Sequence, residues 1–319
     1  MAQVGCGGVL VADTFCGPMR QLPVEGELLV VEQMLPGAGG CAANVAIGLA
    51  RQGIGVEVVG CLGRDVAAGM VVGGLEAEGV GCGQVAYTAD HPTSKTVILI
   101  VEGQDRRYLH TFGANRAFTV GHIPRPWVAG LRVFYLGGLF LLPAFCTGEF
   151  LGLLQFCRAH GVVTVVDVVT PRQVSGMEEL APLLPYIDYF VPNDDEARVL
   201  TGCAEPGAQA RALLDGGAGT VIITCGRGGA LAARRGECWR AAAYPVEVVD
   251  PSGAGDAFSS GLITGVLRGW ELPRMLEYAS TLGASAVRAI GTTPGVFSAA
   301  EAAAFVAGHP LAVSAAALP

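Results

Sequence analysis

The sequence predicts an α/β fold in which a mainly parallel sheet lies between helices. Short β-branched runs alternate with longer amphipathic stretches, and strand–helix–strand alternation is typical of a parallel sheet with both faces covered. Hydrophobic residues make up 51% of the chain and charged residues only 15%, so a large core can form. No repeat or linker divides the chain, so we expect a single domain over residues 1–319.

The expected elements follow from hydrophobic periodicity and from the clustering of β-branched residues. Strands are expected at residues 56–60, 96–101, 133–136, 162–167, 189–191 and 220–224. Helical patterns lie between several of them, at residues 44–52, 67–79, 148–160, 194–200 and 208–215. A further strand-like run covers residues 245–249, and an amphipathic helix is expected at residues 257–268.

Two segments depart from this alternation and predict a small β appendage. Residues 93–112 show a strand, a turn at 102–105 and a second strand, which is the pattern of a hairpin without a helix. Residues 17–34 contain Pro18 and Pro23 and have no helical pattern. We expect lid segments at about 14–38 and 84–118. Such a lid can exclude water from a reaction, although a hairpin that only completes the sheet gives the same pattern.

Charge and cysteine usage bound the partners and the compartment. The formal net charge is −8 and no Lys/Arg run is present, so neither nucleic acid nor an anionic membrane is an expected partner. The first residues lack the basic and apolar regions of a secretory signal. The ten cysteines form no C-x-x-C pair, which favours free thiols in a reducing cytoplasm.

The strongest motif is the glycine-rich stretch at residues 250–258. The strand-like run before it and the helix after it place Gly253, Ala254 and Gly255 at a helix N-terminus, where unpaired N–H groups bind anions. Asp256 then lies beside a bound phosphate, where it could accept a proton from an attacking hydroxyl. An ordinary turn with Asp256 as the helix N-cap explains the same spacing. The stretch is not a P-loop, because no Gly-Lys-Ser/Thr follows it.

A second glycine-rich stretch at residues 36–44 precedes the first expected helix. Gly39 and Gly40 allow a ligand to approach the backbone, and Asn44 can both donate and accept hydrogen bonds. The alternative is a glycine-rich helix start with Asn44 facing solvent. The glycines at residues 5–8 do not fit a dinucleotide fingerprint, which disfavours a dehydrogenase.

Together, the two glycine-rich motifs resemble the signatures of the PfkB (ribokinase-like) family of carbohydrate and nucleoside kinases. Residues 39–44, continuing to 60–65, resemble the N-terminal signature, and residues 250–258 resemble the C-terminal one. Pro251 and Ser252 stand where two threonines are common. The resemblance covers essentially the whole chain. It implies a three-layer ribokinase-like fold with a β lid. It also implies ATP-dependent phosphorylation of a hydroxyl, with Asp256 as general base and the backbone of residues 253–255 as anion hole.

The resemblance also assigns the remaining site residues. It implies a sugar site, a nucleotide site, a water-mediated Mg²⁺ anchor and a monovalent cation site, with K⁺ as the candidate ion. The residues concerned are Asp13, Gly39, Gly40 and Asn44 for the sugar, Asn193, Thr224, Gly226 and Gly229 for the nucleotide, Glu196 for Mg²⁺ and Asp250 for the monovalent cation. It further implies a homodimer formed through the lid. From the residues alone, Asn193 and Glu196 are equally the capping box of a helix, and residues 224–229 a strand followed by a hairpin turn.

Departures from the family pattern bear on the substrate. Ribokinases carry Lys-Gly where this chain has Cys41 and Ala42, and they carry a Glu after the mid-chain strand that residues 136–140 lack, so ribose is disfavoured. Three arginines in or near the expected lid would suit a phosphorylated acceptor, but hairpin arginines are usually solvated, and we favour an unphosphorylated acceptor. A nucleoside kinase, with aromatic side chains stacking on the base, and a catalytically inactive sugar sensor are the alternatives. The arginines are Arg106, Arg107 and Arg116, and the aromatic residues are Phe112, Phe118 and Phe140.

Overall fold

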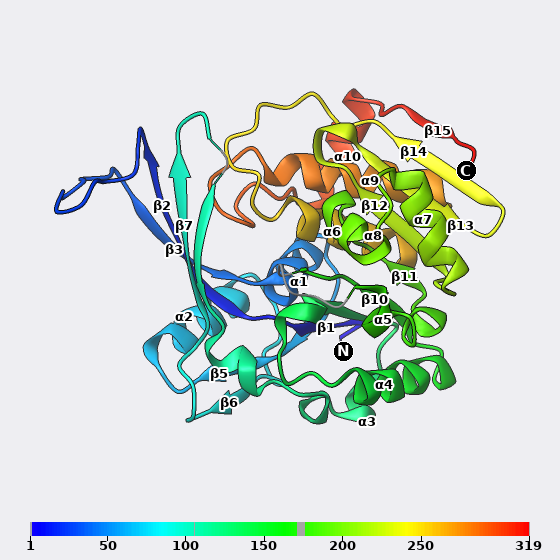
Figure 1. Cartoon of the computed structure of the whole chain (residues 1–319), viewed down its shortest axis with the longest axis horizontal. Coiled ribbons are helices and arrows are strands. Elements are labelled where there is room, and N and C mark those ends of the chain that lie inside the picture. The colour runs from blue at the N-terminus through cyan, green and yellow to red at the C-terminus, as the bar shows by residue number, and fades with distance from the viewer. Residues whose placement is uncertain (1, 105, 171–175, 319) are drawn as a thin grey trace.

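The computed structural model describes residues 2–104, 106–170 and 176–318 (Figure 1). Residue 105, at the end of the expected turn 102–105, lies outside the described residues, as do residues 1, 171–175 and 319 of the expected domain.

The body is built around a nine-stranded sheet of order β15-β14-β13-β12-β11-β10-β9-β1-β4. The six strands from β12 to β4 pair in parallel, and three antiparallel strands complete the other side. This confirms the expected mainly parallel sheet. The parallel strands are β1 (Val4–Gly8), β4 (Val56–Val59), β9 (Val133–Gly137), β10 (Val163–Val166), β11 (Tyr189–Phe190) and β12 (Thr220–Thr224), and the antiparallel ones are β13 (Ala230–Arg234), β14 (Glu237–Ala241) and β15 (Val313–Ala315).

Helices cover both faces of this sheet, so the body has three layers (Figure 1). Alternate residues of β9 show the reason, because Val133 and Tyr135 pack into one core while Phe134 and Leu136 pack into the other. The core that contains Val133 and Tyr135 also contains residues of α1 (Cys41–Arg51), α2 (Val66–Ala77), α8 (Ala254–Leu267) and α9 (Leu272–Ala286). Helix α10 (Ala299–Gly308) packs on α8 and α9. The core that contains Phe134 and Leu136 also contains residues of α3 (Arg125–Ala129), α4 (Thr147–Ala159), α5 (Met177–Leu180), α6 (Asp194–Thr201) and α7 (Pro206–Asp215).

A separate four-stranded sheet of order β3-β2-β7-β8 projects from the body at the left of Figure 1. It consists of β2 (Val11–Met19), β3 (Met34–Gly39), β7 (Lys95–Val101) and β8 (Arg107–Thr111). Strands β7 and β8 pair antiparallel, so the hairpin expected at 93–112 is confirmed, while its service as a lid stays a prediction. A short parallel pair, β5 (Cys61–Gly63) and β6 (Ala86–Thr88), lies beside the body.

The approach to the glycine-rich stretch at residues 250–258 differs from expectation in two ways. The strand expected at residues 245–249 is wrong, because this segment forms no ladder with another strand of the described chain and its Val248 and Val249 are exposed. Its backbone hydrogen bond to the rest of the body runs from the N–H of Val249 to the Val287 carbonyl. Pro245, which has no N–H, weakens any ladder there. The helix expected from residue 257 begins instead at Ala254, directly after a left-handed Gly253. Asp256 therefore lies inside the first helical turn.

No helix among residues 2–104, 106–170 and 176–318 combines the length and the apolar character needed to cross a membrane.

Candidate active site

Polar residues gather where the parallel strands end. Asp167 follows β10, Asn193 comes three residues after β11, and Thr224 is the last residue of β12. Since β10, β11 and β12 are neighbours in the sheet, their carboxyl ends meet at one edge, the usual ligand site of such folds. An isolated parallel bridge between Asn193 and Thr224 confirms that these two residues lie side by side.

The glycine-rich turn opens α8 toward this edge. Gly253 adopts φ +75°, and a Cβ there would lie 2.2 Å from the carbonyl oxygen of Thr292, so only glycine fits. The first intrahelical bond runs from the N–H of Ala257 to the Gly253 carbonyl at 2.9 Å, and the N–H groups of residues 254–256 therefore point out of the helix. No heavy atom of a neighbouring element lies within 4 Å of a Cβ built on Gly255. This end of α8 has free donors and room for an anion.

Asp256 is the third residue of α8, and Gly253 is the N-cap of that helix. No side chain caps this helix, so the interpretation of Asp256 as an N-cap is wrong. Its carboxylate instead accepts a hydrogen bond of 2.8 Å from Nδ2 of Asn44, which also rules out an Asn44 that faces solvent. Burial raises the pKa of Asp256 to about 6, and hydrogen bonds from Asn44 and Cys41 partly oppose this rise. A carboxylate with this pKa is mostly ionised at neutral pH and is suited to accept a proton.

Asp167 is a second acid at this edge, partly buried, that the sequence did not single out. The hydroxyl of Tyr135 donates to its carboxylate at 3.1 Å. Burial raises its pKa well above the usual range, and the charges of Glu196 and Asp256 raise it further. The available signal was an acidic residue at the end of an expected strand, 162–167, that neighbours the strand leading to Asn193.

Asn193 and Glu196 form the capping box of α6. The Asn193 side chain accepts from the N–H of Glu196 at 2.8 Å, and the Glu196 carboxylate accepts from the N–H of Asn193 at 2.9 Å. The helix-capping interpretation is thus confirmed. Within this capping box, the backbone N–H of Asn193 donates to the Oε2 atom of Glu196. Burial is the main cause that raises the pKa of Glu196 to about 7, and the charge of Asp256 adds to it. A divalent cation beside these acids would relieve their mutual repulsion.

The donor set suits a cation that the nucleotide brings. The sulfur of Cys41 and one carboxylate oxygen each of Asp167 and Asp256 lie within 4.8 Å of one another. Mg²⁺ prefers oxygen ligands and keeps several waters, so a thiol with two carboxylates is not a complete Mg²⁺ cage. These residues fit a hydrated Mg²⁺ held mainly by nucleotide phosphates.

Asp250 ties the glycine-rich turn to the chain segment after α9. One carboxylate oxygen accepts from the N–H of Ser252 and the other from the N–H of Gly291, both at 2.9 Å. The hydroxyl of Ser252 is buried and has no hydrogen-bond partner among the described residues. An unsatisfied buried oxygen next to a buried carboxylate fits a monovalent cation.

The expected sugar residues meet at the base of the four-stranded sheet. Asp13 of β2 is buried, and its carboxylate lies so close to Gly39 that a Cβ there would be 1.8 Å from Oδ2. Gly40 adopts φ +91°, and a Cβ there would be 2.3 Å from the Val9 carbonyl oxygen. Burial raises the pKa of Asp13 to about 7, a hydrogen bond with Thr96 lowers it, and the charge of Asp256 raises it. Gly39 therefore makes space for Asp13, and Gly40 allows the chain to enter α1.

Three of the four expected nucleotide residues, Thr224, Gly226 and Gly229, lie at the end of β12 and in the turn that leads to β13, while the fourth, Asn193, caps α6. The N–H of Cys225 donates to the Gly229 carbonyl at 2.8 Å, which closes the turn and confirms the strand-and-turn interpretation of residues 224–229. A Cβ on Gly229 would lie 2.0 Å from the Ala241 carbonyl oxygen, whereas one on Gly226 would meet nothing within 4 Å. Gly226 thus faces open space, while Gly229 packs against the backbone of β14, and both adopt a positive φ that favours glycine.

Comparison with known proteins identifies the class. The model of the pfkB family carbohydrate kinases matches residues 11–299. An ATP-dependent 6-phosphofructokinase of Thermoanaerobacterium thermosaccharolyticum is 25% identical over 79% of this chain and 80% of its own. An Arabidopsis thaliana ribokinase, solved with ribose and ATP, superposes with a TM-score of 0.81 at 22% identity, over 96% of this chain and 99% of that one. A protein described as a ribokinase II from E. coli, solved with ATP and Mg²⁺, gives 0.83 at 21% identity, over 97% and 100%.

The fold is therefore ribokinase-like, a large and mostly parallel sheet flanked by helices. The chain belongs to the pfkB family of carbohydrate kinases, which are transferases that phosphorylate a hydroxyl group.

Proposed function

We propose that this kinase transfers the γ-phosphoryl group of ATP, bound with Mg²⁺, to a hydroxyl of a small sugar-like acceptor. The observation that carries the proposal is the position of Asp256, in the first turn of α8, beside outward N–H groups and held by Asn44. Its carboxylate accepts the hydroxyl proton while that oxygen attacks the γ-phosphorus and ADP leaves. The N–H groups of residues 253–255, the expected anion hole, together with that of Asp256, stabilise negative charge on the phosphoryl oxygens.

The acceptor in this proposal is unphosphorylated and is held by Asp13 and Asn44. Asp13 is buried and Asp167 and Glu196 are partly buried beside the base, and whatever negative charge these acids carry disfavours a phosphate on the acceptor. Arg107 and Arg116 are exposed and engaged on the four-stranded sheet or near it. Arg107 bonds to Gln104 at 2.7 Å and Arg116 stacks on Phe112.

The nucleoside alternative loses one of its three aromatic residues. Phe118 is completely buried and stacks on Phe145 in the core, so it cannot stack on a base. Phe112 and Phe140 are only partly buried, and they keep the alternative testable.

The direct test is a coupled ADP-release screen of pentoses, hexoses, sugar acids, inositols, sugar phosphates and nucleosides. Turnover with an unphosphorylated sugar or sugar-like compound supports the proposal. Turnover with sugar phosphates alone refutes the unphosphorylated acceptor, and turnover with nucleosides alone establishes the alternative. Sugar binding by calorimetry without any ADP release would instead identify an inactive sensor.

The proposed Mg²⁺ anchor, Glu196, gives the first prediction. Glu196→Gln keeps the capping box, since Gln serves at that position, but removes a charge beside the metal. We expect the Mg²⁺ concentration for half-maximal activity to rise about 10-fold, with maximal activity largely kept, as for other residues that act through metal-bound water. Excess EDTA should abolish turnover.

The matched control is Asp195→Asn, which removes an exposed charge from the same helical turn. An unchanged Mg²⁺ titration in Glu196→Gln contradicts the assignment.

We propose that K⁺ binds beside Asp250, and equal activity with K⁺ or with tetramethylammonium refutes that site.

We also propose that residues 1–319 form one domain. In it, segments 14–38 and 84–118 form a lid over the acceptor. The lids of two chains then pair to make a homodimer. Asp13 lies on the four-stranded sheet itself, so acceptor and sheet are in contact in this proposal. The segment before β3 exposes apolar side chains to an unusual degree, with Leu28 89% and Val30 85% exposed, and Leu109 of the edge strand β8 is 64% exposed. Apolar side chains near sheet edges are typical of surfaces that pair.

The lid and the dimer are tested together. Light scattering should give twice the chain mass for the wild type, and the double variant Leu28→Asp/Val30→Asp should give a monomer. Val66→Asp, at an equally exposed apolar position on α2, should leave the mass unchanged. Acceptor binding should slow hydrogen exchange in β7 and β8. A monomeric wild type refutes the dimer, and unchanged exchange refutes the lid.

We propose a cytoplasmic location, with neither nucleic acid nor a membrane as partner. All ten cysteines are free thiols, as expected in a reducing compartment. Recovery of the native protein in a membrane fraction after cell lysis would refute this location.

A further inference from the structure

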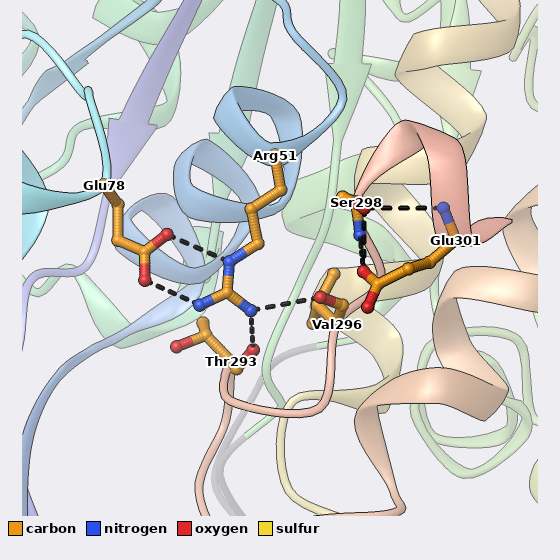
Figure 2. A network of polar contacts seen from close by, with 6 residues as sticks. All are labelled: Arg51, Glu78, Thr293, Val296, Ser298 and Glu301. Atoms are coloured by element: carbon orange, nitrogen blue, oxygen red, sulfur yellow. Dashed lines mark hydrogen bonds and ion pairs between the residues drawn. The ribbon is translucent and has the colours of Figure 1, made fainter.

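The segment from Gly291 to Phe297 lies against both ends of the helix that supplies Asn44. Asn44 and Arg51 are seven residues apart on α1, which is two helical turns, so they share one face. Oδ1 of Asn44 accepts a hydrogen bond of 2.9 Å from the hydroxyl of Thr292. Arg51 donates to the carbonyls of Thr293 and Val296 (Figure 2). One face of α1 therefore forms hydrogen bonds with the segment at two points.

Arg51 is itself fixed by a paired carboxylate. Its Nε and Nη2 donate to Glu78, at 2.9 and 2.6 Å, while its Nη1 faces the segment (Figure 2). Both side chains are partly buried, and a two-pronged pair of this kind has a defined geometry. Thr292, the neighbour of Thr293, is thus held by a rigid frame rather than by a free loop.

The position of Thr292 matters because an amide has two unlike ends. A carboxylate only accepts hydrogen bonds, so Asp256 requires the Nδ2 end of Asn44 to face it. In that orientation Oδ1 points away and would be left without a donor if the Thr292 hydroxyl were absent. With the amide flipped, Oδ1 would face the carboxylate and repel it.

Thr292 also touches the anion-binding turn. The carbonyl oxygen of Thr292 packs where a Cβ of Gly253 would be, and the N–H of Gly291 is bound by Asp250. The same short segment thus contacts the partner of the base and the start of α8.

We propose that Thr292 is a positioning residue for phosphoryl transfer. Its hydroxyl holds the Asn44 amide in the orientation that donates to Asp256, and the Arg51–Glu78 pair fixes the segment that carries it. This inference rests on the proposed role of Asp256 as the base, and it names a residue outside both glycine-rich motifs.

The test is Thr292→Val, which keeps the shape of the side chain and removes only the hydroxyl. We expect kcat to fall about 5-fold to 10-fold and KM for ATP to stay within about 2-fold, because one hydrogen bond that orients the base is lost. The acid limb of the pH profile should move up by about half a unit, since the ionised form of Asp256 loses a fixed donor. The other titratable groups around Asp256, namely Asp13, Cys41, Asp167 and Glu196, are the same in every variant.

Two further variants separate positioning from general damage. Thr292→Ser should restore kcat and the pH profile. Thr293→Val makes the same chemical change one residue away, where the described residues offer the hydroxyl no hydrogen bond, and it should behave as wild type because the carbonyl bound by Arg51 remains.

A double-mutant cycle decides the inference even if Thr292→Val is less stable. If Thr292 acts through Asn44, adding Thr292→Val to Asn44→Ala should change kcat by less than about 2-fold. Independent, multiplicative losses, or a Thr292→Val enzyme with wild-type kcat and pH profile, would overturn it. Full activity in Asp256→Asn would instead remove the base assignment, so the two failures are distinguishable.

Discussion

Replacement of Asp256 by Asn is expected to lower kcat by about 10²-fold or more while ATP still binds with wild-type affinity. The amide has nearly the shape of the carboxylate but cannot take a proton from the acceptor hydroxyl, and a positioned base typically contributes at least this factor. The outward N–H groups of residues 254–256 are unchanged, so the phosphate site should survive. Single-turnover kinetics and ATP titration measure the two quantities separately.

The wild-type pH profile provides the companion result. Because burial raises the pKa of Asp256 to about 6, the base is ionised above that pH and protonated below it. With both substrates and Mg²⁺ saturating, kcat should therefore fall as the pH drops through about 6, and this fall should be absent from the residual kcat of Asp256→Asn. Saturation is needed because Asp13 and Glu196, whose pKa values are raised to about 7, act on acceptor and Mg²⁺ binding in this proposal. Asp195→Asn is the control for removing one carboxylate near the same sheet edge. An Asp256→Asn enzyme that keeps near-wild-type turnover would falsify the assignment of the base.

Replacement of Asp13 by Asn should raise KM for the acceptor by about 10-fold to 10²-fold and leave KM for ATP within about 2-fold. Above pH 7, where Asp13 is ionised, a buried carboxylate that accepts bonds from sugar hydroxyls contributes more than a neutral group, because hydrogen bonds to charged acceptors are roughly twice as strong. Asp13 is 6% exposed and Gly39 leaves room for its carboxylate, so the Asn variant fits the same space. Initial rates with each substrate varied in turn give both constants.

A second variant at this position tests the geometry rather than the charge. In Gly39→Ala the new Cβ would overlap Oδ2 of Asp13, so the carboxylate must move and acceptor KM should rise again. Gly37→Ala, two residues away, has no atom within 4 Å of the added Cβ and should behave as wild type. If acceptor and ATP constants rise together in Asp13→Asn, the residue supports the fold rather than the acceptor.

Local pattern was sufficient to predict much of this protein. Alternation of β-branched runs and helical stretches predicted the parallel sheet and its two helical layers, because these periodicities depend on neighbouring residues alone. The two glycine-rich motifs were found for the same reason, since the left-handed conformation at Gly253 and the sharp entry at Gly40 are local demands that glycine meets. The run at 245–249 failed because strand propensity alone does not supply a hydrogen-bonding partner.

The tertiary structure decided what faces what. Sequence spacing allowed Asp256 to be either an N-cap or a base, and the start of α8 at Ala254, with Asn44 donating from a helix 212 residues away, settles its orientation. Asp167 joins this group because β10 lies beside β11 in the sheet, and Thr292 reaches Asn44 from a segment that also bonds to Arg51 of the same helix. Distances between residues that are far apart in the chain depend on strand order and helix packing. No local periodicity contains that information.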